Sequence, residues 1–259
     1  INCGLLLRRA LGGWRDLWLP CALMGWVMFC PVQWQEFLWP SCHMDTLPLL
    51  FLTSSMLVLG RERMSWWLRL TLCAVFAWTA TYSFAAGLTL WVLVPLAAGC
   101  GYGFPEIASR KRFLMAWSLP MAIVLFLYFH NLKNEADAPF AYGQGNVETM
   151  TRSFGAVLQA PEKGFKFALT LLCANFARGI FGDRTLVATG MGILGAGVFA
   201  LGLAALRRSW KQFRARRAAL PFAMIALYGM CVAGMVAAGR AWASKDVGGA
   251  LNNRYACFA

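Results

Sequence analysis

The chain has 259 residues, of which 59% are hydrophobic and 14% are charged, and its mean hydropathy is +0.56. A soluble domain usually carries about 25% charged and about 45–50% apolar residues. Because a small globule cannot bury so much apolar surface, this composition excludes a soluble enzyme, a disordered chain and a secreted disulfide scaffold. We predict an all-α protein that crosses a bilayer several times. Since the chain begins at Ile1 and stops in an apolar run at Ala259, we expect a fragment of a longer protein.

The formal net charge of +13 has two explanations, nucleic-acid binding and membrane orientation. The cations gather in short segments between apolar runs, and residues 207–217 hold six of them in eleven positions. Loops rich in Lys and Arg stay on the cytoplasmic side of a membrane. We therefore interpret the charge as an orientation signal, expect membrane lipids as partners, and do not expect nucleic acid.

A membrane-spanning helix needs about 17–25 mostly apolar residues. Seven crossings are predicted, at residues 17–32 and 37–60, two within 65–104, and at 113–129, 185–206 and 218–239. A tight turn at 82–87 separates the third crossing from the fourth. A crossing at 164–182 would force the basic segment 207–217 outside, so this stretch is predicted to be re-entrant or interfacial. It lies within an outer loop, 130–184, of one transmembrane domain that covers the whole chain.

Small residues recur every fourth position in the last two predicted crossings. They are Ala188, Gly192, Ala196, Ala200 and Ala204 in the first crossing, and Gly229, Ala233 and Ala237 in the second. Such stripes let helix backbones approach closely where lipid supplies no hydrophobic drive. We therefore predict that residues 185–206 and 218–239 form a tight antiparallel hairpin.

Cysteine and histidine provide little evidence for a metal or redox site. The nine cysteines include no CxxC pair, and most lie in apolar runs, which is typical of small buried side chains. A bridge between Cys30 and Cys42 stays open as an alternative. Two histidines with scattered carboxylates do not form a metal motif, so we expect no metal ion, and no cofactor is indicated.

Polar residues at membrane depth are candidates for function, because they are costly to leave unsatisfied in lipid. On the predicted outer side they are Gln33, Trp34, Glu36, Trp39, His43 and Asp45 in the first loop, Ser83 in the turn, and Arg240, Arg254 and Tyr255 after the last crossing. The arginine fork suits phosphate oxygens. Structural alternatives remain: the tryptophans as interfacial anchors, His43 with Asp45 as a helix-end pair, Ser83 as a turn residue, and Arg240 snorkelling to headgroups.

Three strings carry a resemblance to a known family: FCPVQWQEFLWPSCHM, YSFAAGLTLW and GRAWASKDVGGALNNRYACFA. They resemble motifs of a large family of poorly characterised bacterial multi-spanning proteins. The architecture of that family is similar to that of polytopic glycosyltransferases that use polyprenyl-phosphate sugar donors and face outward. The chain departs from the motifs at Phe37, Pro40 and Asn253, which stand where the family has Asn, Gly and Ser.

The resemblance implies a protein of the bacterial cytoplasmic membrane that transfers a sugar from a polyprenyl phosphate at the outer face. It implicates Gln33, Trp34, Glu36, Trp39, Ser83, Gly87, Trp91, Arg240, Arg254 and Tyr255. Glu36 or Asp45 would act as the catalytic base, and Arg240 with Arg254 would neutralise the leaving phosphate. The alternatives are a lipid or solute transporter (flippase) and a non-catalytic membrane assembly protein. The predicted crossings contain no mid-span carboxylate and no internal repeat, which disfavours transport.

Overall fold

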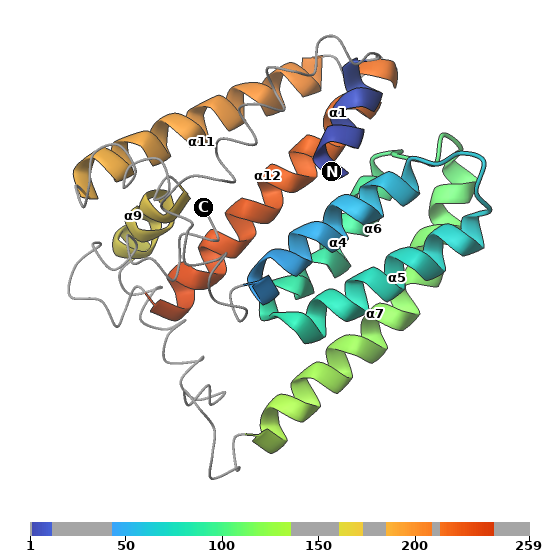
Figure 1. Cartoon of the computed structure of the whole chain (residues 1–259), viewed down its shortest axis with the longest axis horizontal. Coiled ribbons are helices and arrows are strands. Elements are labelled where there is room, and N and C mark those ends of the chain that lie inside the picture. The colour runs from blue at the N-terminus through green and yellow to red at the C-terminus, as the bar shows by residue number, and fades with distance from the viewer. Residues whose placement is uncertain (1, 12–42, 136–160, 173–184, 209–212, 241–259) are drawn as a thin grey trace.

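The computed structural model of the chain describes residues 2–11, 43–135, 161–172, 185–208 and 213–240 (Figure 1). Its helices are α1 (Asn2–Leu11), α4 (His43–Leu59), α5 (Trp66–Ser83), the 3-10 helix η4 (Ala85–Thr89), α6 (Leu90–Gly99), α7 (Ile107–Glu135), α9 (Pro161–Leu172), α11 (Thr185–Arg208) and α12 (Phe213–Arg240). These ranges contain no strand, which confirms the predicted all-α fold.

Two of the described helices are long and apolar enough to cross a membrane. The qualifying stretches are Ile107–Tyr128 in α7 and Arg217–Met235 in α12. Helices α4, α5, α6 and α11 also lie where crossings were predicted, but none of them meets this criterion within the described residues, and α6 has only 10 residues. The first predicted crossing, 17–32, lies outside the described residues. Length and composition therefore support two crossings, and the count of seven stays a prediction.

The long apolar stretch between residues 65 and 104 forms two helices, as predicted. The Ser65 side chain caps α5 by accepting a hydrogen bond from the backbone N–H of Leu68. The helix ends at Ser83, and Phe84 is extended, with φ −161° and ψ 143°. The short helix η4 then reverses the chain into α6, which runs back beside α5. The turn predicted at 82–87 is thus confirmed.

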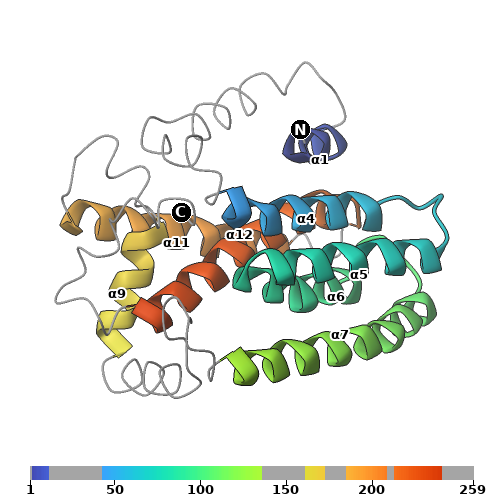
Figure 2. The same cartoon turned by 60° about the horizontal axis from the view of Figure 1, so that its bottom comes forward.

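A buried apolar core joins α4, α5, α6 and α12. Its fully buried side chains include Met56, Cys73 and Val94, and α12 contributes Met224 and Val232. Helix α7 packs on the outer side of α5 and α6 (Figure 2). The core therefore covers one face of α7 and leaves its other face outside.

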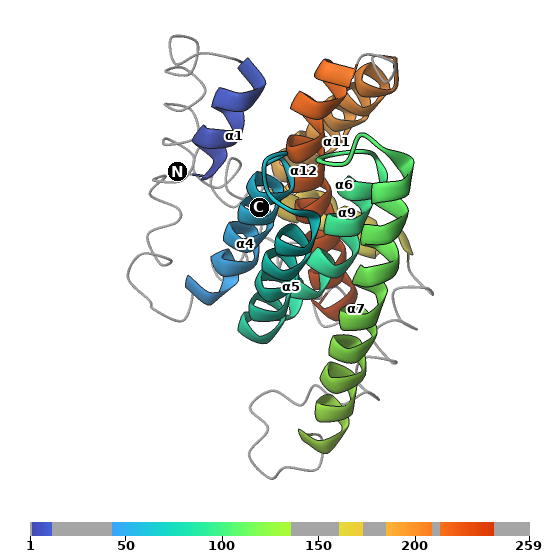
Figure 3. The ribbon, with the colours of Figure 1, turned by 90° about the vertical axis from the view of Figure 1, so that its right-hand side faces the viewer.

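The connections of the bundle fall at two ends, and the first carries most of the described cations. The α4–α5 loop (60–65), the α6–α7 loop (100–106) and the start of α12 lie together (Figure 3). We call this the basic end. The first turn of α4, the last turn of α5 with η4, and the end of α12 lie at the other end, because α12 runs antiparallel to α4 and packs against η4. We call this the site end.

The predicted tight hairpin between α11 and α12 is wrong. Helix α9 packs against both of them, and α11 makes its closest approach to α9. A Cβ on Gly192 would lie 2.0 Å from the carbonyl oxygen of Leu169, whereas a Cβ on Gly229 would meet nothing within 4 Å. The small-residue pattern identified a face that permits close packing, but the partner comes from a segment about twenty residues earlier.

Helix α9 itself falls in the stretch predicted to be re-entrant or interfacial. Its 12 residues are too few for a crossing, which requires about 17–25. The hydroxyl groups of Thr170 and Thr189 lie 2.7 Å apart and join α9 to α11. The rest of the predicted re-entrant segment, 173–182, lies outside the described residues, as do 136–160 and 183–184 of the predicted outer loop.

Candidate functional site

Most residues of the predicted site lie outside the described part of the chain. These are Gln33, Trp34, Glu36, Trp39, Arg254 and Tyr255. The backbone positions of four others are described, namely His43, Asp45, Ser83 and Arg240. The cysteine pair left open as a bridge, Cys30 with Cys42, also lies outside the described ranges.

The structure brings the four described positions to one end of the bundle by the direction of their helices. His43 is the first residue of α4, Ser83 is the last residue of α5, and Arg240 is the last residue of α12. Asp45 lies in the same first turn of α4 as His43. Ser83 and Arg240, which are 157 positions apart in the sequence, thus lie at helix ends on the same side of the bundle. This end of the bundle is our candidate functional site.

Ser83 has a structural role that is visible in its contacts. Its hydroxyl donates a 2.6 Å hydrogen bond to the carbonyl oxygen of Thr79, one turn earlier in α5. Serine hydroxyls often bond back to the preceding turn in this way near the end of a helix. The side chain is half-buried. A part in substrate binding stays a prediction, and it would require this hydroxyl to accept a further hydrogen bond or to change partner.

Gly87 allows the close approach of η4 to α5. A Cβ at this position would lie 2.2 Å from both the carbonyl carbon and the oxygen of Ala80, and 2.5 Å from the backbone nitrogen of Thr81. No side chain fits such a space without moving one of the two backbones. The glycine of the YSFAAGLTLW string is therefore explained by backbone packing directly below the site end.

Trp91, the last residue of that string, is buried and holds the turn from the inside. Its indole N–H donates a 2.9 Å hydrogen bond to the hydroxyl of Thr81, which in turn donates to the carbonyl of Ala77. The indole of Trp117 in α7 donates to the backbone carbonyl of Trp91, and the two rings lie 5.1 Å apart between centroids. This chain of bonds connects α5, α6 and α7, so Trp91 supports the site end without reaching its surface.

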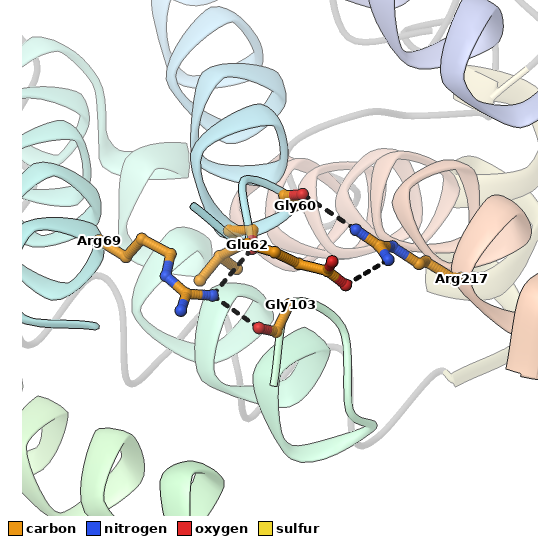
Figure 4. A network of polar contacts seen from close by, with 6 residues as sticks. Gly60, Glu62, Arg69, Gly103 and Arg217 are labelled. Atoms are coloured by element: carbon orange, nitrogen blue, oxygen red, sulfur yellow. Dashed lines mark hydrogen bonds and ion pairs between the residues drawn. The ribbon is translucent and has the colours of Figure 1, made fainter. Parts of the chain in front are cut away.

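The basic end contains a buried arginine that the sequence analysis did not single out. Arg69 is 7% exposed, and its Nη1 donates hydrogen bonds to the carbonyls of Gly103 at 2.6 Å and Leu59 at 3.4 Å (Figure 4). Its guanidinium carbon lies 4.4 Å from the centroid of the Phe104 ring, a cation–π contact. The Nε atom of Arg69 is buried and has no hydrogen-bond partner.

Gly103 makes room for this arginine. It adopts φ +75°, and a Cβ there would lie 2.0 Å from the carbonyl oxygen of Leu59. A glycine is required because both the left-handed backbone and the close contact exclude a side chain. A cation embedded in the apolar string WWLRLTLCAV was the available sequence signal for this network, but its partners are 10 and 34 residues away.

A second arginine attaches α12 to the same loop. Arg217 forms an ion pair with Glu62 and donates a 3.1 Å hydrogen bond to the carbonyl of Gly60 (Figure 4). Both side chains of the ion pair are partly exposed, at 34% and 57%. Surface ion pairs of this kind contribute little free energy of folding by themselves. This pair nevertheless connects the start of α12 to the α4–α5 loop.

The described residues offer no arrangement for metal or thiol chemistry. Within these ranges, no three His, Cys, Asp or Glu side chains are grouped so that they could hold a metal ion. Within the same ranges, no disulfide joins Cys3, Cys73, Cys100 and Cys231. Burial raises the pKa of the Cys3 thiol in α1, which keeps it protonated and weakly nucleophilic.

No protein-family model, no curated protein and no solved structure matches the chain. The resemblance of its three strings to a bacterial membrane-protein family therefore stays a prediction.

Proposed function

We propose that the chain is a multi-spanning protein of the bacterial cytoplasmic membrane. The observation that carries this proposal is the outward face of α7. Only 17% of the apolar stretch Ile107–Tyr128 is buried, and Met115, Leu119 and Phe126 are each at least 66% exposed. A helix of this length in the core of a soluble protein would bury such side chains, since large contiguous apolar patches are rare on soluble surfaces.

The same pattern extends to neighbouring helices. Val75 and Trp78 on α5, Val92 on α6 and Leu201 on α11 are large apolar side chains that face outward. Exposing these apolar side chains costs less free energy among the hydrocarbon chains of lipids than in water. We propose seven crossings, with α9 as a re-entrant or interfacial helix of the outer loop, so that the basic end faces the cytoplasm and the site end faces outward.

We further propose that the site end transfers a sugar from a polyprenyl-phosphate donor to an acceptor hydroxyl. The transfer needs a carboxylate to take the acceptor proton and cations to stabilise the departing phosphate. Glu36 or Asp45 would supply the first, and Arg240 with Arg254 the second. The support is the resemblance of the three strings, together with the position of Asp45, Ser83 and Arg240 at helix ends on the same side of the bundle.

A reconstituted transfer assay tests this proposal. The full chain in vesicles is given a polyprenyl-phosphate sugar together with a bacterial envelope extract as the source of acceptor hydroxyls, and release of free polyprenyl phosphate is measured. We expect Arg254→Ala and Arg240→Ala to reduce release at least about 100-fold, because each removes a cation from the developing negative charge. Arg63→Ala removes an exposed cation at the basic end and should leave release unchanged.

Insertion of every variant is checked by resistance to alkaline extraction. Normal turnover in Arg254→Ala and Arg240→Ala would remove the proposed phosphate site. Donor movement across the bilayer without release of polyprenyl phosphate would indicate a carrier instead of a transferase.

A further inference from the structure

The cations of the basic end divide into two groups that the structure separates clearly. Arg69, Arg110 and Arg217 are engaged within the protein. Among the other cations of this end, the side chains of Arg61, Arg63, Lys111 and Arg112 are exposed. The engaged arginines hold the loops in place, and the exposed cations are available to bind a partner at the basic end.

Arg110 and Arg217 anchor the two loops next to the exposed cations. Arg61 and Arg63 lie in the α4–α5 loop, and Lys111 and Arg112 follow the α6–α7 loop in α7. Arg110 donates to the carbonyl of Phe104 at 2.7 Å and to that of Pro105 at 2.6 Å, which anchors the α6–α7 loop beside Lys111 and Arg112. Arg217 contacts Gly60, directly before Arg61. The exposed cations thus project from anchored backbone.

Few carboxylates compete for these cations. The described acids of the basic end are Glu62, which pairs with Arg217, and Glu106, which accepts a 3.2 Å hydrogen bond from the Ser109 hydroxyl. The surface therefore keeps a positive charge that a polyanionic partner can neutralise.

The position of these cations relative to the apolar surface identifies the partner. Lys111 and Arg112 lie in the second turn of α7, and the exposed apolar side chains of the same helix resume at Met115, about one helical turn (5.4 Å) further on. On α5, Trp67 is 59% exposed and its ring stacks on Trp66 at the helix start, close after Arg63. An exposed tryptophan next to cations, above an apolar flank, is typical of the headgroup region of a membrane.

We propose that the exposed cations of the basic end bind the phosphate groups of anionic phospholipids in the adjacent leaflet. The inference rests on the proposed membrane setting, but it goes beyond orientation, since it assigns a lipid-binding surface to Arg61, Arg63, Lys111 and Arg112. A nucleic acid or an acidic soluble protein would contact the cations alone, whereas a lipid contacts the cations with its headgroup and the exposed apolar flank with its acyl chains.

The proposed preference for anionic phospholipids can be measured by lipid retention. The purified chain is reconstituted in vesicles of equal phosphatidylcholine and phosphatidylglycerol, extracted in mild detergent, and its retained lipids are quantified. We expect phosphatidylglycerol to predominate severalfold, and the preference to fall in 1 M salt because the Debye length drops to about 3 Å. The double variant Lys111→Gln/Arg112→Gln should lower the relative affinity for phosphatidylglycerol about tenfold, as should Arg61→Gln/Arg63→Gln.

A control variant with the same change in charge separates a defined surface from general attraction. Lys163→Gln/Lys166→Gln removes two cations from α9, away from the basic end (Figure 1), and should leave the preference unchanged. An equal loss in this control would overturn the proposal, as would equal retention of both lipids by the unaltered chain. Displacement of the retained lipid by a duplex oligonucleotide would also contradict it and would indicate a general polyanion site.

A measurement of membrane insertion separates failure of this inference from failure of the proposed function. If the chain enters phosphatidylcholine vesicles and resists alkaline extraction but retains both lipids equally, the lipid-binding surface alone is wrong. If the chain enters no vesicle of either composition, the membrane setting fails and the lipid-binding surface fails with it.

Discussion

Gly87 lies against the backbone of Ala80 so closely that a Cβ built on the glycine would be 2.2 Å from the carbonyl carbon of the alanine. This contact lets η4 reverse the chain between α5 and α6. The contact therefore determines how closely η4 packs against α5 next to the site end.

Replacing Gly87 with alanine should push η4 away from α5. Overpacking of a tight contact costs about 1–3 kcal/mol, so we expect the free energy of unfolding in detergent to fall by this amount. The matched control is Gly197→Ala in α11, where a Cβ would meet nothing within 4 Å. The control should be neutral or stabilising by up to about 1 kcal/mol, since alanine favours helix. Equal stability of Gly87→Ala and the parent would contradict the packing role.

The hydrogen bond between Trp91 and Thr81 provides a second prediction. Thr81→Val keeps the shape of the side chain but leaves the buried indole N–H without its acceptor, which costs about 1–3 kcal/mol. Thr79→Val, two residues earlier on the exposed side of α5, should change the free energy of unfolding by less than about 0.5 kcal/mol. Chemical unfolding of both variants in micelles measures the difference, and similar losses would refute this assignment.

Arg69 should be needed for the basic end to form. Arg69→Met removes the donor from the carbonyls of Gly103 and Leu59, and hydrogen bonds from a charged group contribute about 1.5–3 kcal/mol. We expect a loss in this range, with faster proteolysis of the loops at 60–65 and 100–106. Arg63→Met changes an exposed arginine and should leave both readouts unchanged. Arg69→Met with parental stability would mean that the buried network contributes nothing.

The ion pair between Arg217 and Glu62 should be weak. Its partly exposed side chains predict a coupling energy of about 0.2–1 kcal/mol in a double-mutant cycle of Arg217→Gln and Glu62→Gln. Raising the salt concentration should reduce the coupling further, because dissolved ions screen charges that are exposed to solvent. A coupling above about 2 kcal/mol that persists in 1 M salt would contradict this prediction and would indicate a desolvated pair.

Helix positions were accessible from the sequence because apolar runs and charged interruptions are local features. The turn at 82–87 was predicted for this reason, and Gly87 occupies the position that the close contact requires. The end of α7 was less accessible: its apolar pattern stops near Phe129, yet the helix continues to Glu135. Backbone hydrogen bonds can continue a helix after its side chains become polar.

The hydrogen bonds and the ion pair of the basic end could not be predicted, because they join residues far apart in the chain. Arg69 meets Gly103 across 34 positions, and Arg217 meets Glu62 across 155. The partner of Gly192 was misassigned for the same reason, since a stripe of small residues does not indicate which helix will fill it. The shared end of His43, Ser83 and Arg240 follows from helix direction, which the predicted topology did contain.

Accessibility to a membrane-impermeant thiol reagent tests the central claim most directly. Single cysteines replace Gln33, Tyr255, Arg63 and Arg112, and labelling above that of the parent chain is measured in sealed right-side-out membrane vesicles. We predict that Gln33→Cys and Tyr255→Cys are labelled in intact vesicles, and that Arg63→Cys and Arg112→Cys are labelled only after permeabilisation. Labelling of Gln33→Cys and Tyr255→Cys from opposite faces, or of all four positions in intact vesicles, would contradict a membrane protein with its site end outward and its basic end inward.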